Sequence, residues 1–140
     1  MITINYLAVL VSGFASIALG SLWYGPLFGK KWIALSGITK QMTDKAKPKD
    51  MIKAYVLSFV GALLTAYILS HYIVFANAYF DKSGALAGAT SGFWAWLGFV
   101  APMTMGMVLW EGKSWKLWLI NNGYNLVFLL VAGMILGAWA

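Results

Sequence analysis

The fold is decided by the uncharged stretch INYLAVLVSGFASIALGSLWY, residues 4–24. A helix of about 20 apolar residues is long enough to cross a hydrocarbon core of roughly 30 Å. Three further stretches of this kind follow, at about residues 52–74, 84–110 and 115–139. The sequence therefore predicts an all-α integral membrane bundle of four transmembrane helices, with residues 1–140 forming a single domain.

The composition supports this assignment. Hydrophobic residues make up 61% of the chain and charged residues 10%, whereas soluble proteins have about 45–50% apolar and about 25% charged residues. These values exclude a soluble enzyme and a disordered tail. The chain has no Cys, which excludes disulfides, thiolate metal sites and a cysteine nucleophile.

The lysines predict the orientation in the membrane. Nine of the ten basic residues lie in the first loop, at the start of the second span, or around the short third loop. These two loops lie on the same face of a four-span protein, and the positive-inside rule assigns that face to the cytoplasm. Both termini are then expected outside (N-out/C-out), and residues 25–51 form a Lys-rich cytoplasmic loop.

The connections contain local structure of their own. Phe28, Trp32 and Leu35 share one helical face opposite two lysines, which predicts a short helix lying in the membrane interface. Asp50 is expected to cap the second span, and Ser114 to cap the fourth after a tight turn at residue 112.

Small residues recur at four-residue spacing in every span, and such rows allow helices to approach closely in a membrane. In the third span the row is Gly84, Gly88 and Gly92. Two interpretations stay open: the row packs within one chain, or it faces a second copy in a homo-oligomer.

The fourth span contains three asparagines, Asn121, Asn122 and Asn125. Polar residues are costly within a membrane and often carry function. The tight turn places residues whose numbers sum to about 225 at the same depth, so Thr104 is expected level with Asn121.

The asparagines have two possible roles. Pro102 deprives the carbonyl of Gly98 of its backbone donor, and Asn125 or Asn122 is expected to replace it. Alternatively, the three asparagines line a polar path.

Trp94 and Trp96, near the middle of the third span, need acceptors such as Thr65 or Ser16.

Two motifs resemble a family of small bacterial four-span membrane proteins of unknown function. They are WYGPLFGKKW, residues 23–32, and EGKSWKLWLINNGYNLV, residues 111–127. The resemblance implies a helical protein of the bacterial cytoplasmic (inner) membrane and carries no activity. Its recurring positions are Trp23, Tyr24, Gly25, Phe28, Gly29, Trp32, Glu111, Asn121, Gly123 and Tyr124, which the predicted topology gathers toward the cytoplasmic half.

The sequence contains no catalytic triad, metal-ligand cluster or phosphate-binding glycine loop, so we expect no enzyme, no cofactor and no bound metal. A chain without Arg is also not expected to bind nucleic acid. Two functions from different classes remain. One is a homo-oligomeric transporter or channel-like protein for a small solute or ion. The other is a non-catalytic accessory or scaffolding subunit that docks on itself or on a larger membrane complex.

Overall fold

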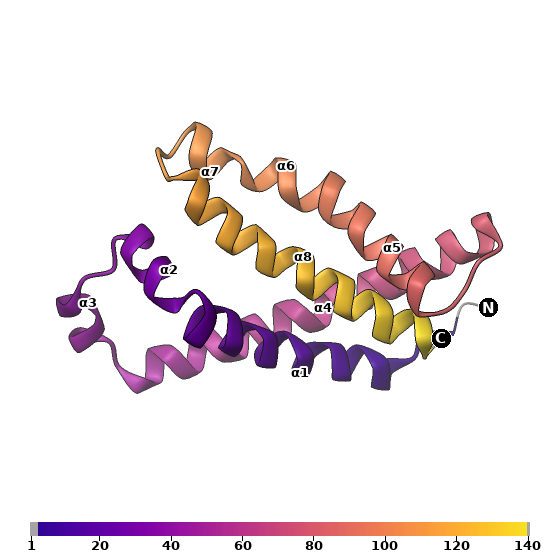
Figure 1. The fold of residues 1–140 in the computed structure, drawn as a ribbon. Coiled ribbons are helices and arrows are strands. Elements are labelled where there is room, and N and C mark those ends of the chain that lie inside the picture. The colour runs from indigo at the N-terminus through magenta and orange to yellow at the C-terminus, as the bar shows by residue number, and fades with distance from the viewer. Residues whose placement is uncertain (1–2, 140) are drawn as a thin grey trace.

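The computed structural model describes residues 3–139, and these form a bundle of four long helical rods, of which the first two are joined by a long connection and the others by short ones (Figure 1). The first rod is α1 (Tyr6–Leu22) with the π-helical segment η1 (Trp23–Leu27), and the second is α4 (Pro48–Phe80). The third comprises α5 (Ala85–Ala95), the π-helical segment η2 (Trp96–Val100), α6 (Ala101–Thr104) and α7 (Gly106–Leu109). The fourth is α8 (Trp115–Ala138). Each rod is long and apolar enough to cross a membrane, so the predicted all-α bundle of four candidate spans is confirmed.

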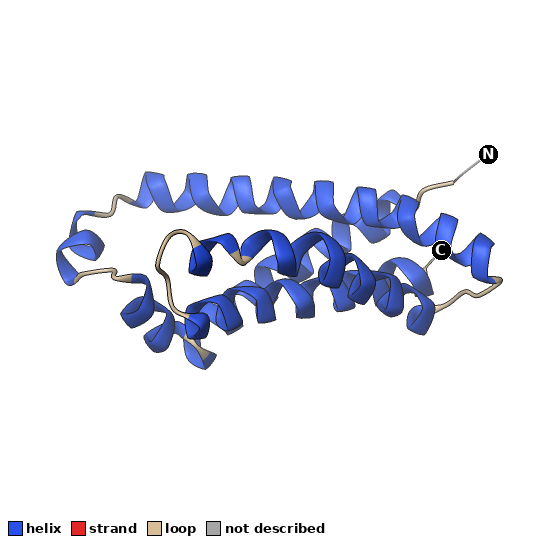
Figure 2. Ribbon diagram, turned by 90° about the horizontal axis from the view of Figure 1, so that it is seen from above, coloured by secondary structure: helices blue, strands red, loops and turns tan. Residues whose placement is uncertain are grey.

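Both Lys-rich connections lie at one end of the bundle, which we call the Lys-rich end (Figures 1 and 2). The first carries α2 (Gly29–Ser36) and α3 (Lys40–Lys45), and the second is the turn between α7 and α8. The termini lie at the opposite end, where the Asn5 side chain donates a hydrogen bond of 2.8 Å to the carbonyl of Trp139. The rods therefore alternate in direction, and the side of the membrane that the Lys-rich end faces stays a prediction.

Helix α4 is longer than the predicted span of 52–74. It begins at Pro48 and ends at Phe80, where Asp81 adopts a left-handed conformation with φ 51°. Asp50 therefore lies in the first turn, and the expectation that it caps the helix was wrong. Proline suits the first helical position because it has no N–H to leave unpaired and its φ is already helical.

Helix α2 confirms the predicted short helix after the first span. Phe28, Trp32 and Leu35 are half-buried, whereas Lys30 and Lys31 are exposed. The chain reaches α2 through η1, in which Gly25 has the non-helical angles φ −107° and ψ −106°.

Helices α5 and α8 cross in close backbone contact. A Cβ atom added to Gly88 would overlap the carbonyl oxygen of Gly133, and one added to Gly92 would overlap that of Leu129. Gly84 is part of the same contact, since its carbonyl oxygen lies against Gly137. The predicted glycine row thus packs within one chain, and the interpretation that it faces a second copy was wrong.

The turn between α7 and α8 is built as expected. Gly112 has φ 71°, a left-handed angle that glycine adopts without strain. The Ser114 hydroxyl caps α8 by accepting a hydrogen bond of 3.1 Å from the backbone N–H of Leu117.

A core of small and branched residues joins α1, α4 and α8 in the half of the bundle toward the termini. Ala8, Ala66 and Ala132 have no exposed surface there, and Ile73 has 1%. We call this the core cluster; it consists of Ala8, Val9, Ala62, Ala66, Leu69, Ile73, Phe128, Leu129, Ala132 and Leu136.

Candidate functional site

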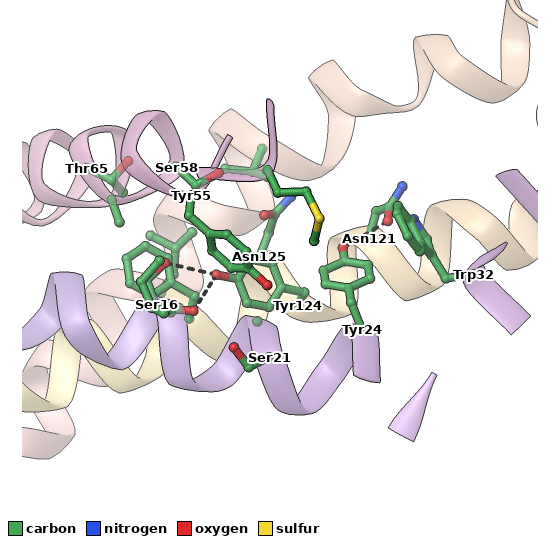
Figure 3. Close-up of a pocket in the computed structure, with 17 residues that line it drawn as sticks. Ser16, Ser21, Tyr24, Trp32, Tyr55, Ser58, Thr65, Asn121, Tyr124 and Asn125 are labelled. Atoms are coloured by element: carbon green, nitrogen blue, oxygen red, sulfur yellow. Dashed lines mark hydrogen bonds between the residues drawn. The ribbon is translucent and has the colours of Figure 1, made fainter. Parts of the chain in front are cut away.

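An open cavity of about 870 Å³ lies between α1, α2, α4, η2 and α8 (Figure 3). We call it the vestibule. It extends from Trp32 and Met51 at the Lys-rich end to Thr65 and Leu129 near the middle of the bundle. Its lining is Ser16, Ile17, Gly20, Ser21, Tyr24, Trp32, Met51, Tyr55, Ser58, Ala62, Thr65, Val100, Asn121, Tyr124, Asn125, Phe128 and Leu129.

The vestibule ends where the core cluster begins. Ala62, Phe128 and Leu129 belong to both, so the inner end of the cavity is the top of the packed core. The alanines of the core cluster let α1, α4 and α8 approach closely beyond that point. Between α1, α4 and α8 the cavity is therefore closed toward the termini, and its outer residues Trp32 and Met51 lie at the Lys-rich end.

Tyr124 and Ser16 form a reciprocal pair on one wall of the vestibule (Figure 3). The Tyr124 hydroxyl donates to the carbonyl of Ser16 at 2.9 Å, and it lies 3.0 Å from the Ser16 hydroxyl. A phenol has a single hydrogen to donate, so the Ser16 hydroxyl is the donor in the second bond. This pair joins α1 to α8 at the depth of the cavity.

The first motif docks directly on the second. The Tyr24 hydroxyl donates to Oδ1 of Asn121 at 2.9 Å, and the Trp23 indole donates to the carbonyl of Ile120 at 2.8 Å. The Trp23 ring covers Gly123, where an added Cβ would lie 2.9 Å from the indole. The two stretches that carry the family resemblance therefore meet at one site.

Asn122 is the centre of a second polar cluster, on the face of α8 that contacts η2 and α6. Its side chain is 1% exposed, accepts from the Thr104 hydroxyl at 2.8 Å and donates to the carbonyl of Trp118 at 3.1 Å. The Trp118 indole donates to Thr104 at 3.1 Å, and the Trp96 indole donates to the backbone carbonyl of Asn122 at 3.0 Å. We call these four residues the asparagine network.

The asparagine network corrects two expectations. The side-chain amide of Asn122 donates to the carbonyl of Trp118, and that of Asn125 donates to Oδ1 of Asn122. Within the described residues, neither amide donates to the carbonyl of Gly98. The chain accommodates Pro102 by widening into η2, where the N–H of Ala101 bonds to the carbonyl of Trp96. A π-helical turn shifts the backbone pairing by one residue, which is a common way to absorb a local disruption.

The second correction concerns the tryptophans of the third span. Trp96 bonds to the carbonyl of Asn122, so neither Thr65 nor Ser16 is its acceptor. Trp94 is 56% exposed on the outer surface of the bundle. The prediction that Thr104 lies level with Asn121 was wrong by one residue, because Thr104 bonds to Asn122.

The candidate residues thus separate into distinct environments. Tyr24, Trp32, Asn121, Tyr124 and Asn125 line the vestibule. Asn122 and Thr104 belong to the asparagine network, Trp23 fastens η1 to α8, and Glu111 is exposed in the turn before α8. A single path lined by all three asparagines and Thr104 is therefore wrong.

Three hydroxyls that the sequence reasoning missed also line the vestibule: Ser21, Ser58 and Thr65 (Figure 3). Several Ser and Thr side chains in the four rods donate to a carbonyl of their own helix, as Ser12, Ser70, Thr90 and Ser91 do, and Ser16 bonds to Tyr124. Ser21, Ser58 and Thr65 have no hydrogen-bond partner among residues 3–139. Met51, Tyr55, Ser58, Ala62 and Thr65 follow helical spacing along α4, and that stripe was the available signal.

Comparison with known families agrees with the two motifs. The model of the family described as "Protein of unknown function (DUF1761)" matches residues 7–137. The chain belongs to this family. No curated protein and no solved structure matches the chain.

Proposed function

We propose that this DUF1761 protein is a membrane transporter that admits a small uncharged solute into the vestibule from the Lys-rich end. The observation that carries the proposal is a cavity with hydroxyl and amide groups in a largely apolar lining, which reaches from the Lys-rich end to the core cluster near the middle of the bundle. A binding site at mid-depth that is accessible from one side is the arrangement that alternating access requires.

The lining favours an uncharged solute over an ion. Its polar groups are hydroxyls and amides, and none of the residues around the cavity carries a charge. An ion entering such a site loses its hydration without gaining a counter-charge, which is costly. Asn121 and Asn125 each keep hydrogen-bonding capacity after their bonds to Tyr24 and Asn122, because a side-chain amide has two donors and one acceptor oxygen.

The closed inner end favours a transporter over a channel. Passage to the side of the termini requires α1, α4 and α8 to separate at the core cluster. The non-helical angles at Gly25 in η1 and the wider turn of η2 are places on the first and third rods, both of which pack on α8, where such a change can be absorbed. The vestibule lies within one chain, so this proposal does not depend on a homo-oligomer.

We extend the proposal to location and chemistry. The Lys-rich end is assigned to the cytoplasm, and the membrane to the bacterial inner membrane, because of the lysine distribution. The protein is proposed to be without catalytic activity, since the vestibule lining offers no pair of nucleophile and base.

The proposal is tested by solute entry into proteoliposomes, followed by light scattering after a gradient of glycerol, urea or erythritol is imposed. We expect at least one of these solutes to enter faster than in protein-free liposomes. Ser58→Leu narrows the vestibule and Asn125→Leu removes an amide from its lining, and each should reduce that rate at least fivefold. Val60→Leu is the matched control, because Val60 lies on α4 outside the cavity and is exposed. Entry at the protein-free rate for all three solutes, or equal rates for all variants, would contradict the proposal.

The alternative is an accessory or scaffolding subunit. The glycine row of the third span, which such a subunit could use for docking, already packs on α8 within the chain, as the contacts of Gly88 and Gly92 show. Docking would instead have to use exposed apolar side chains of α4 such as Val56 and Val60. Absence of solute flux together with co-purification of a defined membrane partner would favour this alternative.

A further inference from the structure

A second cavity of about 350 Å³ adjoins the vestibule on the side of α5 and η2. We call it the apolar groove; it is lined by Leu64, Thr65, Ile68, Leu69, Tyr72, Ala95, Phe99, Val100 and Leu129. Thr65, Val100 and Leu129 line both cavities. The vestibule and the apolar groove therefore form one continuous recess along α4.

Polarity changes along this recess. The vestibule presents Tyr55, Ser58, Asn121 and Asn125, whereas the apolar groove is built almost entirely from hydrocarbon side chains and Phe99. Tyr72 follows Tyr55 by seventeen positions on α4, which corresponds to about 25 Å at 1.5 Å per residue. The recess is thus long, with hydroxyl and amide groups at the Lys-rich end and almost none toward the other.

We propose that the recess binds an amphiphile with an uncharged, hydrogen-bonding head in the vestibule and a single hydrocarbon chain in the apolar groove. This inference rests on the proposed function for an uncharged binding site in the vestibule, and it names the class of ligand for that site. The uncommitted hydroxyl of Thr65 lies where the head meets the chain, and that of Ser58 lies among the groups that meet the head. A hydrocarbon chain alone would leave them without partners, and unpaired polar groups are costly at this depth.

The same lining selects among amphiphiles. A phosphate or carboxylate head would meet no positive side chain around the vestibule. A hydroxyl- or amide-bearing head can both donate to and accept from Asn121, Asn125 and Ser58. The site therefore fits a neutral head better than an ionised one.

Quenching of a fluorescent label tests this inference in nanodiscs, using the absence of native Cys. A bimane is attached to Ile68→Cys in the apolar groove, and three brominated probes are compared: a monoacylglycerol, a fatty acid and an alkane. The control position is Leu7→Cys, which is 55% exposed outside both cavities. Leu7 and Ile68 lie at a similar depth in the bundle. The ring of Tyr6, next to Leu7, stacks on the ring of Tyr67, next to Ile68, at a centroid distance of 6.3 Å.

At Ile68→Cys we expect saturable quenching by the brominated monoacylglycerol at concentrations at least tenfold lower than for the fatty acid or the alkane. At Leu7→Cys the three probes should quench weakly and without saturation. Equal, non-saturating quenching at both positions would mean simple partitioning into the bilayer and would overturn the inference. Equal saturable affinity for all three probes would overturn the selection of a neutral head.

Two further variants in the Ile68→Cys background test where the head of the ligand binds, with Val60→Leu as their control. Asn125→Leu alters the head site and should weaken monoacylglycerol quenching at least fivefold, while Val60→Leu should leave it unchanged. Ser58→Ala is a milder second change that should also weaken quenching, so the result does not depend on one variant folding. Solute flux is measured in parallel: flux without monoacylglycerol binding overturns this inference alone, whereas binding without flux overturns the transport proposal alone.

Discussion

The hydroxyl of Tyr24 donates a hydrogen bond of 2.9 Å to Oδ1 of Asn121, although 97 residues separate them. This bond fastens the irregular end of the first rod to α8 at the mouth of the vestibule. It also turns the amide of Asn121 so that the oxygen is occupied and the nitrogen keeps its hydrogens available. The contact joins the two motifs that mark the family.

Replacing Tyr24 with Phe removes this hydrogen bond while keeping the ring between Trp32 and Tyr124, at centroid distances of 5.2 and 5.5 Å. We expect a loss of about 0.5–1.5 kcal/mol of stability, the usual net value of one such bond. A double-mutant cycle with Asn121→Leu, measured by thermal unfolding in detergent, should show strong non-additivity. Additive effects would mean that the two side chains do not interact.

Asn122→Leu is predicted to be the most destabilising of the asparagine changes. It leaves the Thr104 hydroxyl without its side-chain acceptor and places an apolar group where Asn122 bridges α6 and α8. We expect a loss of roughly 1–3 kcal/mol, the cost of disrupting a buried polar group. Asn121→Leu is the matched control one residue away, and its melting temperature should fall less. The reverse order would contradict the assignment of Asn122 to a structural network.

Gly88→Ala tests the close crossing of α5 and α8. The new methyl would meet the backbone of Gly133, which cannot move aside as a side chain can. Overpacking of this kind costs typically about 1–3 kcal/mol. Gly61→Ala is the control, because nothing lies within 4 Å of an added Cβ there. Equal melting temperatures for the two variants would show that the helices do not cross at Gly88.

Gly123→Ala tests the contact of the Trp23 indole with α8. The added methyl would lie 2.9 Å from the indole, so the ring must shift and its bond to the carbonyl of Ile120 must lengthen. We expect altered Trp fluorescence and a lower melting temperature. In a Trp23→Ala background the same glycine change should have almost no effect. An unchanged penalty in that background would exclude Trp23 as the cause.

The sequence predicts the features that depend on local patterns. The length of the uncharged stretches predicts the four rods, and the positions of the lysines predict that the two basic connections lie at one end. The cap at Ser114 is predicted because serine is common at the start of a helix. The stripe of Phe28, Trp32 and Leu35 identifies α2. Each of these features is determined within one helix or one turn.

The site depends instead on which faces meet, and the sequence predicts it only in part. Adjacent residues on a helix point about 100° apart. Asn121 therefore lines the vestibule and Asn122 bonds to Thr104, although the two are neighbours of the same residue type in the sequence. Asn121 and Asn125 are four apart and share the vestibule. Ser58 resembled a member of a small-residue packing row, and only the separation of α4 from η2 and α8 shows that it lines a cavity. The π-helical turn η2 escaped prediction because a proline signals a disrupted bond without specifying how the backbone absorbs it.

The account depends most on the vestibule being open at the Lys-rich end and closed at the core cluster. Single cysteines at Ser58, Asn125 and Ala132 in sealed proteoliposomes of known orientation test this with a membrane-impermeant thiol reagent. We predict fast labelling of Ser58→Cys and Asn125→Cys from the Lys-rich side, and none of Ala132→Cys. Protection of the two vestibule positions from that side, or their faster labelling from the side of the termini, would contradict it.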